Sequence, residues 1–305
     1  MNRVSSFLVV VLIAAGACAS GDGDSGSPPG AEPSPATKCS GPFQQPLDDV
    51  QAYPEITSSE LTVGPNRVLI GVRNTQDAPI GSPALDVQVD FYDLEACTGE
   101  AEFSAQTEFV WTIEPVVGVY VAEPEFETPG VWGAEVTVSG QGLDETSKVA
   151  FQVSAKSRTP ALGERPPATD NLTAADAKDL SEISTDKNPD PDFYEKTVAE
   201  ALEDKDPFVV IFATPKFCQT QVCGPMLDIV KKEAKDFPDV TFIHIEPYEL
   251  PADPAQLKAV EAAVEWNLQT EPWVFVMDGS GRVVSKYEAA ISPEELRADL
   301  KDISK

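Results

Sequence analysis

Two cysteines, Cys218 and Cys223, stand five positions apart in the stretch FATPKFCQTQVCGP (212–225). Two cysteines at short spacing serve as a redox couple, a structural disulfide or part of a metal site. In a regular helix, five residues give a rise of about 7.5 Å and a turn of about 140°. A disulfide needs the two Cα atoms within about 7 Å. A bridge between these cysteines therefore requires residues 219–222 to form a loop.

The residues around the pair indicate how such a loop would be placed. An unbroken apolar run, FVVIF (208–212), precedes the cysteines and is typical of a buried strand. A helix is expected after them, because Pro225 suits a first helical turn and apolar residues then recur at helical spacing. Cys218 would then lie in an exposed loop, with Cys223 near the helix N-terminus, where the dipole favours a thiolate. We expect Cys218 to attack a partner sulfur and Cys223 to resolve the mixed disulfide.

The elements that would position this loop alternate between strand and helix patterns. Helical periodicity is found in residues 193–207, 225–237, 254–266 and 292–304, and strand patterns in 208–212, 240–246 and 273–287. The last helix has a well-marked start, since Ser292 suits the N-cap, Pro293 the first turn and Glu295 a capping box. The order is strand, helix, strand, helix, strand, strand, helix.

This order, the cysteines between the first strand and its helix, and the stretch TEPW (270–273) together resemble the thioredoxin family. The resemblance covers residues 193–305 and implies an α/β thioredoxin-like domain of βαβ-α-ββα order. It also implies a thiol–disulfide oxidoreductase with Cys218, Cys223 and the cis-proline Pro272 as its site. The chain departs from the family in having four residues, not two, between the cysteines.

Three other uses of the pair stay open. One is a structural Cys218–Cys223 disulfide on a non-catalytic thioredoxin-like binding domain, because secreted domains often carry such bridges. Another is a peroxiredoxin-like peroxidase, because the stretch TPKFCQTQVCG resembles the cysteine loop of peroxiredoxins. In that family a threonine stands three places before the reactive cysteine, whereas Thr214 stands four places before Cys218. A copper or zinc site would need a third ligand, and the only histidine, His244, falls in a predicted strand. We therefore expect neither a metal nor a cofactor.

The preceding region reads as an all-β module. Apolar and polar residues alternate with period two in LDVQVDFY (85–92) and VWGAEVTVS (131–139), and turn formers separate six or seven such runs. This pattern predicts an immunoglobulin-like antiparallel sandwich over residues 39–155. Trp111 and Trp132 are expected in its core. Residues 156–192, rich in Pro, Asp and Ser, are expected to be a linker.

The first residues, MNRVSSFLVVVLIAAGACAS, indicate export. The apolar run 7–17 is shorter than the roughly 20 residues that span a bilayer, and it fits a signal peptide. Its end resembles the bacterial lipoprotein signal, in which a cysteine after small residues becomes lipidated. Residues 1–18 would then be the signal and lipobox, with Cys18 lipidated and 19–38 a disordered tether. An ordinary cleaved signal peptide is the alternative.

If the protein is exported, predictions follow for its disulfides, its location and its partners. Four cysteines other than Cys18 would pair in an oxidising compartment, and of the three connectivities the one that joins Cys39 to Cys97 and Cys218 to Cys223 is favoured. The first of these bridges would be structural. The protein would be anchored by lipid to the extracytoplasmic face of the cell membrane and act on extracytoplasmic protein thiols or disulfides. The net charge of −29 makes nucleic acid a poor partner.

Overall fold

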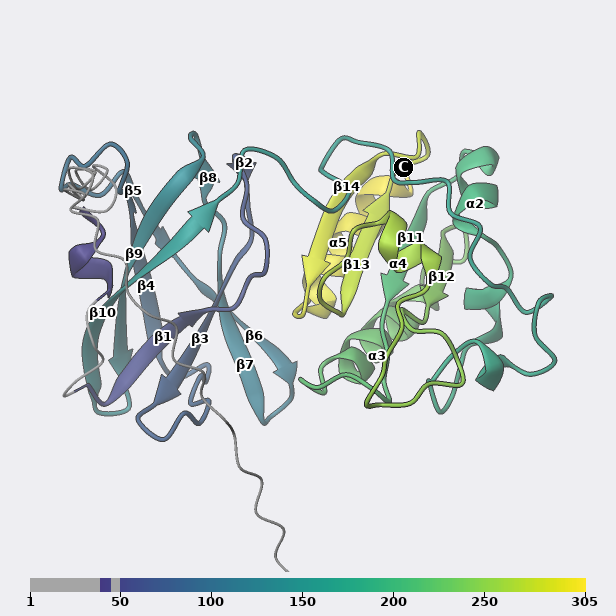
Figure 1. Ribbon diagram of the computed structural model, residues 1–305, viewed down its shortest axis with the longest axis horizontal. Helices are drawn as coiled ribbons and strands as arrows, with labels where there is room; N and C mark the ends of the chain where they lie inside the picture. Colours follow the sequence, from purple (N-terminus) through teal and green to yellow (C-terminus); the bar gives the residue numbers. More distant parts are fainter. Residues whose placement is uncertain (1–38, 45–49) are drawn as a thin grey trace, which may run out of the picture. The chain divides into compact units, whose positions relative to one another are not determined.

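The computed structural model describes residues 39–44 and 50–305 (Figure 1). Cys18, with the predicted signal peptide and tether, lies outside the described residues. The first ten strands are β1 (Ala52–Ile56), β2 (Gly64–Pro65), β3 (Val68–Asn74), β4 (Asp86–Asp93), β5 (Phe103–Gln106), β6 (Glu108–Ile113), β7 (Val117–Ala122), β8 (Glu125–Phe126), β9 (Gly130–Gly140) and β10 (Leu143–Val153).

These strands make two antiparallel four-stranded sheets, in the orders β1-β3-β7-β6 and β10-β9-β4-β5, and β2 pairs with β8. The alternating sequence explains the layering. In β4, Val87, Val89 and Phe91 are buried, whereas the residues between them are exposed or half-exposed. They share one apolar core with residues of the other sheet, such as Ile70. The region is therefore an antiparallel β-sandwich, in which each sheet supplies one face of the core.

The two tryptophans of the sandwich differ. Trp132 is buried, with 3% of its surface exposed, and its ring lies 4.8 Å from that of Phe126. Trp111 is only half-buried, which corrects the expectation that it lies in the core. It alternates along β6 with Val110 and Thr112, which are buried, so its side chain lies on the opposite face of that strand.

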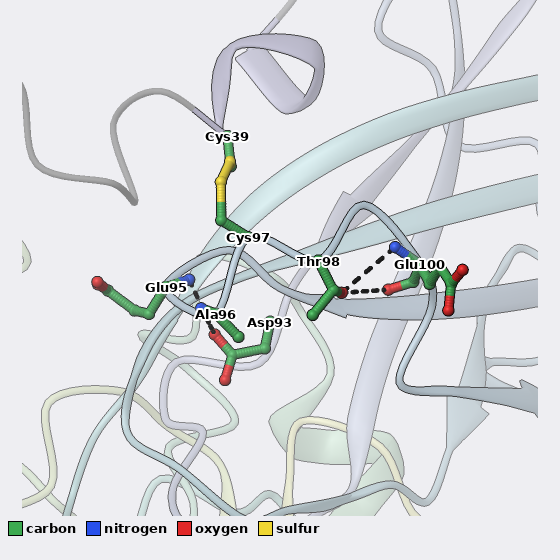
Figure 2. Close-up of a disulfide and its surroundings, with 7 residues drawn as sticks. All are labelled: Cys39, Asp93, Glu95, Ala96, Cys97, Thr98 and Glu100. Atoms are coloured by element: carbon green, nitrogen blue, oxygen red, sulfur yellow. Dashed lines mark hydrogen bonds between the residues drawn. A yellow bond between two sulfur atoms is a disulfide. The ribbon is translucent and has the colours of Figure 1, made fainter.

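A disulfide joins Cys39 to Cys97 across 58 positions, with the Cα atoms 5.8 Å apart (Figure 2). The turn before Cys97 is held by Asp93, whose Oδ1 accepts hydrogen bonds from the amides of Glu95 and Ala96. The short 3-10 helix η1 (Gly41–Gln44) follows Cys39. Its Phe43 is buried against Gly133 of β9, where a Cβ atom would lie 2.5 Å from the Phe43 ring. The disulfide and this contact both fasten the segment 39–44 to the sandwich.

The C-terminal region is built on a mixed four-stranded sheet. Its elements are η2 (Leu180–Glu182), η3 (Pro191–Tyr194), α2 (Val198–Asp204), β11 (Phe208–Phe212), α3 (Cys223–Ala234), β12 (Thr241–Ile245), α4 (Glu261–Glu265), β13 (Trp273–Met277), β14 (Val283–Glu288) and α5 (Pro293–Ile303). The sheet order is β12-β11-β13-β14, with β12 parallel and β13 antiparallel to β11. Every residue of β11 is buried, as a strand covered on both faces requires.

Two apolar clusters lie on opposite faces of this sheet, because neighbouring residues of β11 belong to different clusters. Val209 and Ile211 pack with α3 and α5 residues such as Leu227 and Leu300. The alternate residues of β11 pack with α2, α4 and the fully buried Trp266. The cysteines belong to the first cluster. The sheet therefore provides a rigid support behind them.

Residues 156–192 pack specifically against the C-terminal region. The side chain of Asn171 accepts a hydrogen bond from the amide of Val198, at the start of α2, at 2.8 Å. Thr169 Oγ1 accepts a hydrogen bond from Trp266 Nε1 at 2.9 Å and donates one to Glu265. Both Thr169 and Asn171 are buried.

The predicted fold class, an α/β thioredoxin-like C-terminal domain joined to an all-β sandwich, is wrong: the described residues are mostly β, with 34% strand and 18% helix. Two helices are shorter than their sequence patterns suggested. The helix expected from Phe193 begins at Val198, because Thr197 caps it through a capping box and the residues before form a 3-10 turn. The helix expected over 254–266 covers only α4, because Val260 is extended and begins it late.

Candidate redox site

The loop that carries Cys218 is built by backbone hydrogen bonds on Thr214. The carbonyl of Thr214 accepts the amides of Phe217 at 3.3 Å and of Cys218 at 3.0 Å. The Cys218 carbonyl then accepts the amide of Gln221 at 3.2 Å, and Gln221 adopts a left-handed φ of 62°. Helix α3 begins at Cys223. The chain therefore turns between the two cysteines, and both side chains belong to the same apolar cluster.

The Cys218 sulfur is surrounded by hydrogen-bond donors. The thiol of Cys223 donates to it, Thr220 Oγ1 lies 3.3 Å away, and the amides of Val222 and Cys223 also point at it. These donors, Cys223 foremost, outweigh burial and lower the pKa of Cys218 to about 5. Helix α3 has no side-chain cap of its own, so the sulfur accepts from amides that would otherwise be unpaired. The surroundings of Cys218 therefore favour its thiolate form.

Cys223 differs from Cys218 in the direction of its pKa shift and in its exposure. Its hydrogen bond to Cys218 and its burial raise its pKa, and the charges of Cys218 and Glu271 raise it further. It is fully buried, whereas Cys218 keeps 8% of its surface exposed. The exposed loop position expected for Cys218 is thus corrected to a nearly buried one, because Phe217 and Val222 beside it are themselves buried. The surroundings therefore favour ionisation of Cys218 and oppose that of Cys223.

Glu271 and Pro272 form the next part of the site. The peptide bond between them is cis, and Pro272 is buried. Glu271 is half-buried, and its Oε2 accepts a hydrogen bond from the hydroxyl of Tyr248 at 3.0 Å. Burial and the nearby Cys218 charge raise the pKa of Glu271, and burial and Glu271 raise that of Tyr248. A carboxyl and a phenol therefore stand within electrostatic reach of both sulfurs.

A buried acid, Glu246, lies behind the loop and was not expected from the sequence. It is 5% exposed, and its Oε2 accepts the amide of Thr185 at 2.9 Å and the hydroxyl of Thr185 at 2.6 Å. Its Oε1 is buried without a hydrogen-bond partner among the described residues. Burial raises the pKa of this carboxyl. The only local signal was its position, as the acid that ends the apolar run of β12.

His244 has a structural role. Its Nε2 donates to the carbonyl of Ala213 at 2.9 Å, and its Nδ1 lies 2.6 Å from the hydroxyl of Tyr194. Because Nε2 needs its proton to bond a carbonyl, Nδ1 is the acceptor for Tyr194. Burial lowers the pKa of His244 to about 4. In the described part of the chain, no three His, Cys, Asp or Glu side chains come together as a metal site.

The structure thus brings Cys218 and Cys223 together. Pro272 follows Glu271, whose charge interacts with both cysteines. The predicted lipidation site, Cys18, is not among the described residues. Within residues 39–44 and 50–305, no helix is long and apolar enough to cross a membrane.

Neither a protein-family model nor a curated protein matches the chain. Similar solved structures include a DUF4426 family protein from Pseudomonas aeruginosa, at 13% identity and a TM-score of 0.26, covering 37% of this chain and 97% of the other. They also include a PKD domain from a human VPS10 domain-containing receptor, at 18% identity and a TM-score of 0.21, covering 45% and 98%. An engineered protein matches at 14% identity and a TM-score of 0.24, covering 35% and 20%.

The predicted membership of the thioredoxin family is wrong: the described residues are mostly β with few helices. At these TM-scores the matches carry no argument about function. The function has to be argued from the residues of the site.

Proposed function

We propose that the protein is a thiol–disulfide oxidoreductase that uses the Cys218/Cys223 pair. The observation that supports this most is the arrangement of two neighbouring thiols at the start of α3, whose surroundings favour ionisation of one and oppose ionisation of the other. The donors around Cys218 lower its pKa to about 5, and the Cys223 thiol that supplies the first of them keeps its own proton. A thiolate is the attacking species in disulfide exchange, and a second thiol close by can lose its proton and attack in turn to resolve the mixed disulfide.

The exchange balances as follows. The Cys218 thiolate attacks one sulfur of a partner disulfide, a Cys218–partner disulfide forms, and the other partner sulfur leaves as a thiolate that takes up a proton. Cys223 then loses its proton and attacks the Cys218 sulfur, which releases the second partner sulfur. The partner disulfide is reduced to two thiols, and the pair is oxidised to a Cys218–Cys223 disulfide. The same steps in reverse transfer a disulfide to a partner.

The proposal includes a location. The signal-like sequence 1–18 supports lipidation of Cys18. The lipid would hold the protein at the extracytoplasmic face of a membrane, where its partners would be protein thiols or disulfides. Detergent partitioning of the full chain, compared with Cys18→Ala, tests this. Wild type should enter the detergent phase and the variant the aqueous phase. Equal distribution of the two would contradict the anchor.

The redox proposal is tested by trapping. In Cys223→Ser, Cys218 can attack a partner disulfide but the mixed disulfide cannot be resolved, so covalent complexes with these disulfide-bearing partners should accumulate on non-reducing gels. Cys218→Ser should trap few, because the remaining thiol is buried and protonated. A structural disulfide predicts no trapping by either variant and a native bridge that resists mild reduction. That result would replace the oxidoreductase with a binding domain.

Peroxidase activity is the alternative function that has to be distinguished from thiol–disulfide exchange. It would consume hydrogen peroxide by oxidising the Cys218 thiolate to a sulfenic acid, with water as the other product, and Cys223 would then condense with it. The test uses Cys223→Ser, in which no Cys223 thiol can condense with the sulfenic acid. When this variant is treated with peroxide in the presence of a reagent that reacts with sulfenic acids, modification should be slow if exchange is the function. Rapid modification of Cys218 would favour the peroxidase.

A further inference from the structure

The segment 184–188, which precedes η3, contacts helix α3, the residue that follows β12 and the loop that carries Cys218. Ser184 Oγ bonds the hydroxyl of Tyr194, which in turn bonds His244 of β12. Asp186 forms an ion pair at 2.7 Å with Lys231 of α3, the helix that begins at Cys223. Both partners of this ion pair are mostly buried, which makes its geometry restrictive.

Thr185 makes the most direct connection. Its Oγ1 donates to Glu246 Oε2 at 2.6 Å and accepts the amide of Lys216 at 3.2 Å. The amide of Thr185 also donates to Glu246 at 2.9 Å. Lys216 is two residues before Cys218 in the turn that Thr214 closes, and Thr214 Oγ1 lies 3.5 Å from Thr185 Oγ1.

We propose that the segment 184–188 is part of the candidate site and that Thr185 is a positioning residue for the loop that carries Cys218. Its hydroxyl uses both of its hydrogen-bonding functions, as donor to a buried carboxylate and acceptor from the loop backbone. Glu246 directly follows the last residue of β12 and is 5% exposed, so it gives Thr185 an anchor beside the sheet. Through Thr185, the start of the cysteine loop is tied to the sheet.

The Thr185 contact affects the Cys218 sulfur through the geometry of the loop. The amides of Val222 and Cys223 and the hydroxyl of Thr220 stabilise the Cys218 thiolate only if the sulfur stays in place. Hydrogen bonds lose strength steeply when their angles deviate. Loss of the Thr185 hydroxyl leaves the Lys216 amide without its acceptor, so the turn is less restrained and those donors are less well aimed. This inference rests on the proposed function.

The test compares three variants of the full chain with wild type. Thr185→Val removes the hydroxyl at nearly constant volume, Thr185→Ser retains it, and Ser181→Ala is a control in the same part of the chain, exposed and away from the loop. The first readout is the midpoint of the pH profile of Cys218 alkylation by iodoacetamide. The second is the hydrogen-exchange rate of the Lys216 amide.

In Thr185→Val the midpoint should rise by about one pH unit, a tenfold change in the ionisation equilibrium, and the Lys216 amide should exchange faster. Thr185→Ser and Ser181→Ala should match wild type. The inference is overturned if Thr185→Val matches wild type, or if Thr185→Ser shifts as much as Thr185→Val.

Two further results separate the inference from the proposed function and from misfolding. If Thr185→Val does not fold, the wild-type protein still decides, because an unprotected Lys216 amide would overturn the inference. If wild-type Cys218 titrates as an ordinary thiol while the Lys216 amide is protected, the oxidoreductase fails. The positioning contact would then remain.

Discussion

The hydroxyl of Tyr248 lies 3.0 Å from Glu271 Oε2, and Glu271 immediately precedes the buried Pro272. This pair places a carboxylate within electrostatic reach of Cys218 and Cys223. The Cys218 sulfur and the Glu271 carboxyl therefore stand near each other in a partly buried environment, where the repulsion between negative charges on them is poorly screened. Whatever reacts at Cys218 must approach this negative field.

We predict that Glu271→Gln speeds the second step of exchange. The hydrogen bond to Cys218 and burial are the main causes that raise the pKa of Cys223, and the charge of Glu271 adds to them. Removing that charge should lower the pKa of Cys223, so that the mixed disulfide is resolved several-fold faster at neutral pH. Stopped-flow measurement of partner release checks this. Tyr248→Phe is the control, since it keeps the carboxylate, and its rate should not rise.

The ionisation of Cys218 should depend on the proton that Cys223 donates. Because the hydrogen bond from Cys223 is the first cause that lowers the pKa of Cys218 to about 5, Cys223→Ala should raise that pKa towards the ordinary value of 9.0. Cys223→Ser retains a donor at the same position and should keep the pKa low. Alkylation rates measured from pH 4 to 10 give both values. Equal midpoints in the two variants would show that the α3 amides, and not Cys223, control the thiolate.

Local patterns in the sequence were sufficient for some elements. The capping box predicted at Ser292 is present, with Glu295 returning its side chain to the N-cap amide, and the apolar run of β11 is fully buried. These features depend on residues within one turn or one strand. The five-residue spacing required a loop over 219–222 only if the cysteines were bridged, and the structure has this loop with both cysteines as free thiols.

Long-range contacts could not be read in this way. Thr185 and Glu246 are 61 positions apart, and no periodic pattern links a threonine in a Pro-, Asp- and Ser-rich stretch to an acid at the end of a strand. The segment 156–192 looked like a linker by composition alone. The thioredoxin assignment rested on the order of elements while the cysteine spacing already departed from that family. Order of elements is a weaker criterion than a matching motif, and the assignment was wrong.

The buried histidine makes the protein sensitive to acid. His244 has a folded-state pKa of about 4 and an ordinary value of 6.5, so between these pH values the unfolded chain binds a proton that the native protein does not. Native stability should therefore fall as the pH drops from 6.5 to 4, by on the order of 3 kcal/mol from this group. Urea unfolding of wild type and His244→Gln over this range measures the difference.

His244→Gln should be less stable than wild type at pH 8, because a glutamine cannot serve both Tyr194 and the Ala213 carbonyl as the imidazole does. The gap between the two should narrow steadily as the pH falls. Parallel stability curves for the two proteins would mean that His244 takes up its proton in the native state as readily as in the unfolded chain.

The disulfide between Cys39 and Cys97 should stabilise the sandwich mainly by restricting its unfolded chain. It closes a loop across 58 positions, and loss of a native disulfide typically costs about 2–5 kcal/mol in small secreted domains. The double variant Cys39→Ser/Cys97→Ser should therefore unfold at lower urea concentration, while the alkylation profile of Cys218 stays unchanged. Phe43→Ala is the informative comparison, because it removes the contact with Gly133 and leaves the bridge intact. If the double variant were as stable as wild type, packing of Phe43 and not the disulfide would hold the segment 39–44 to the sandwich.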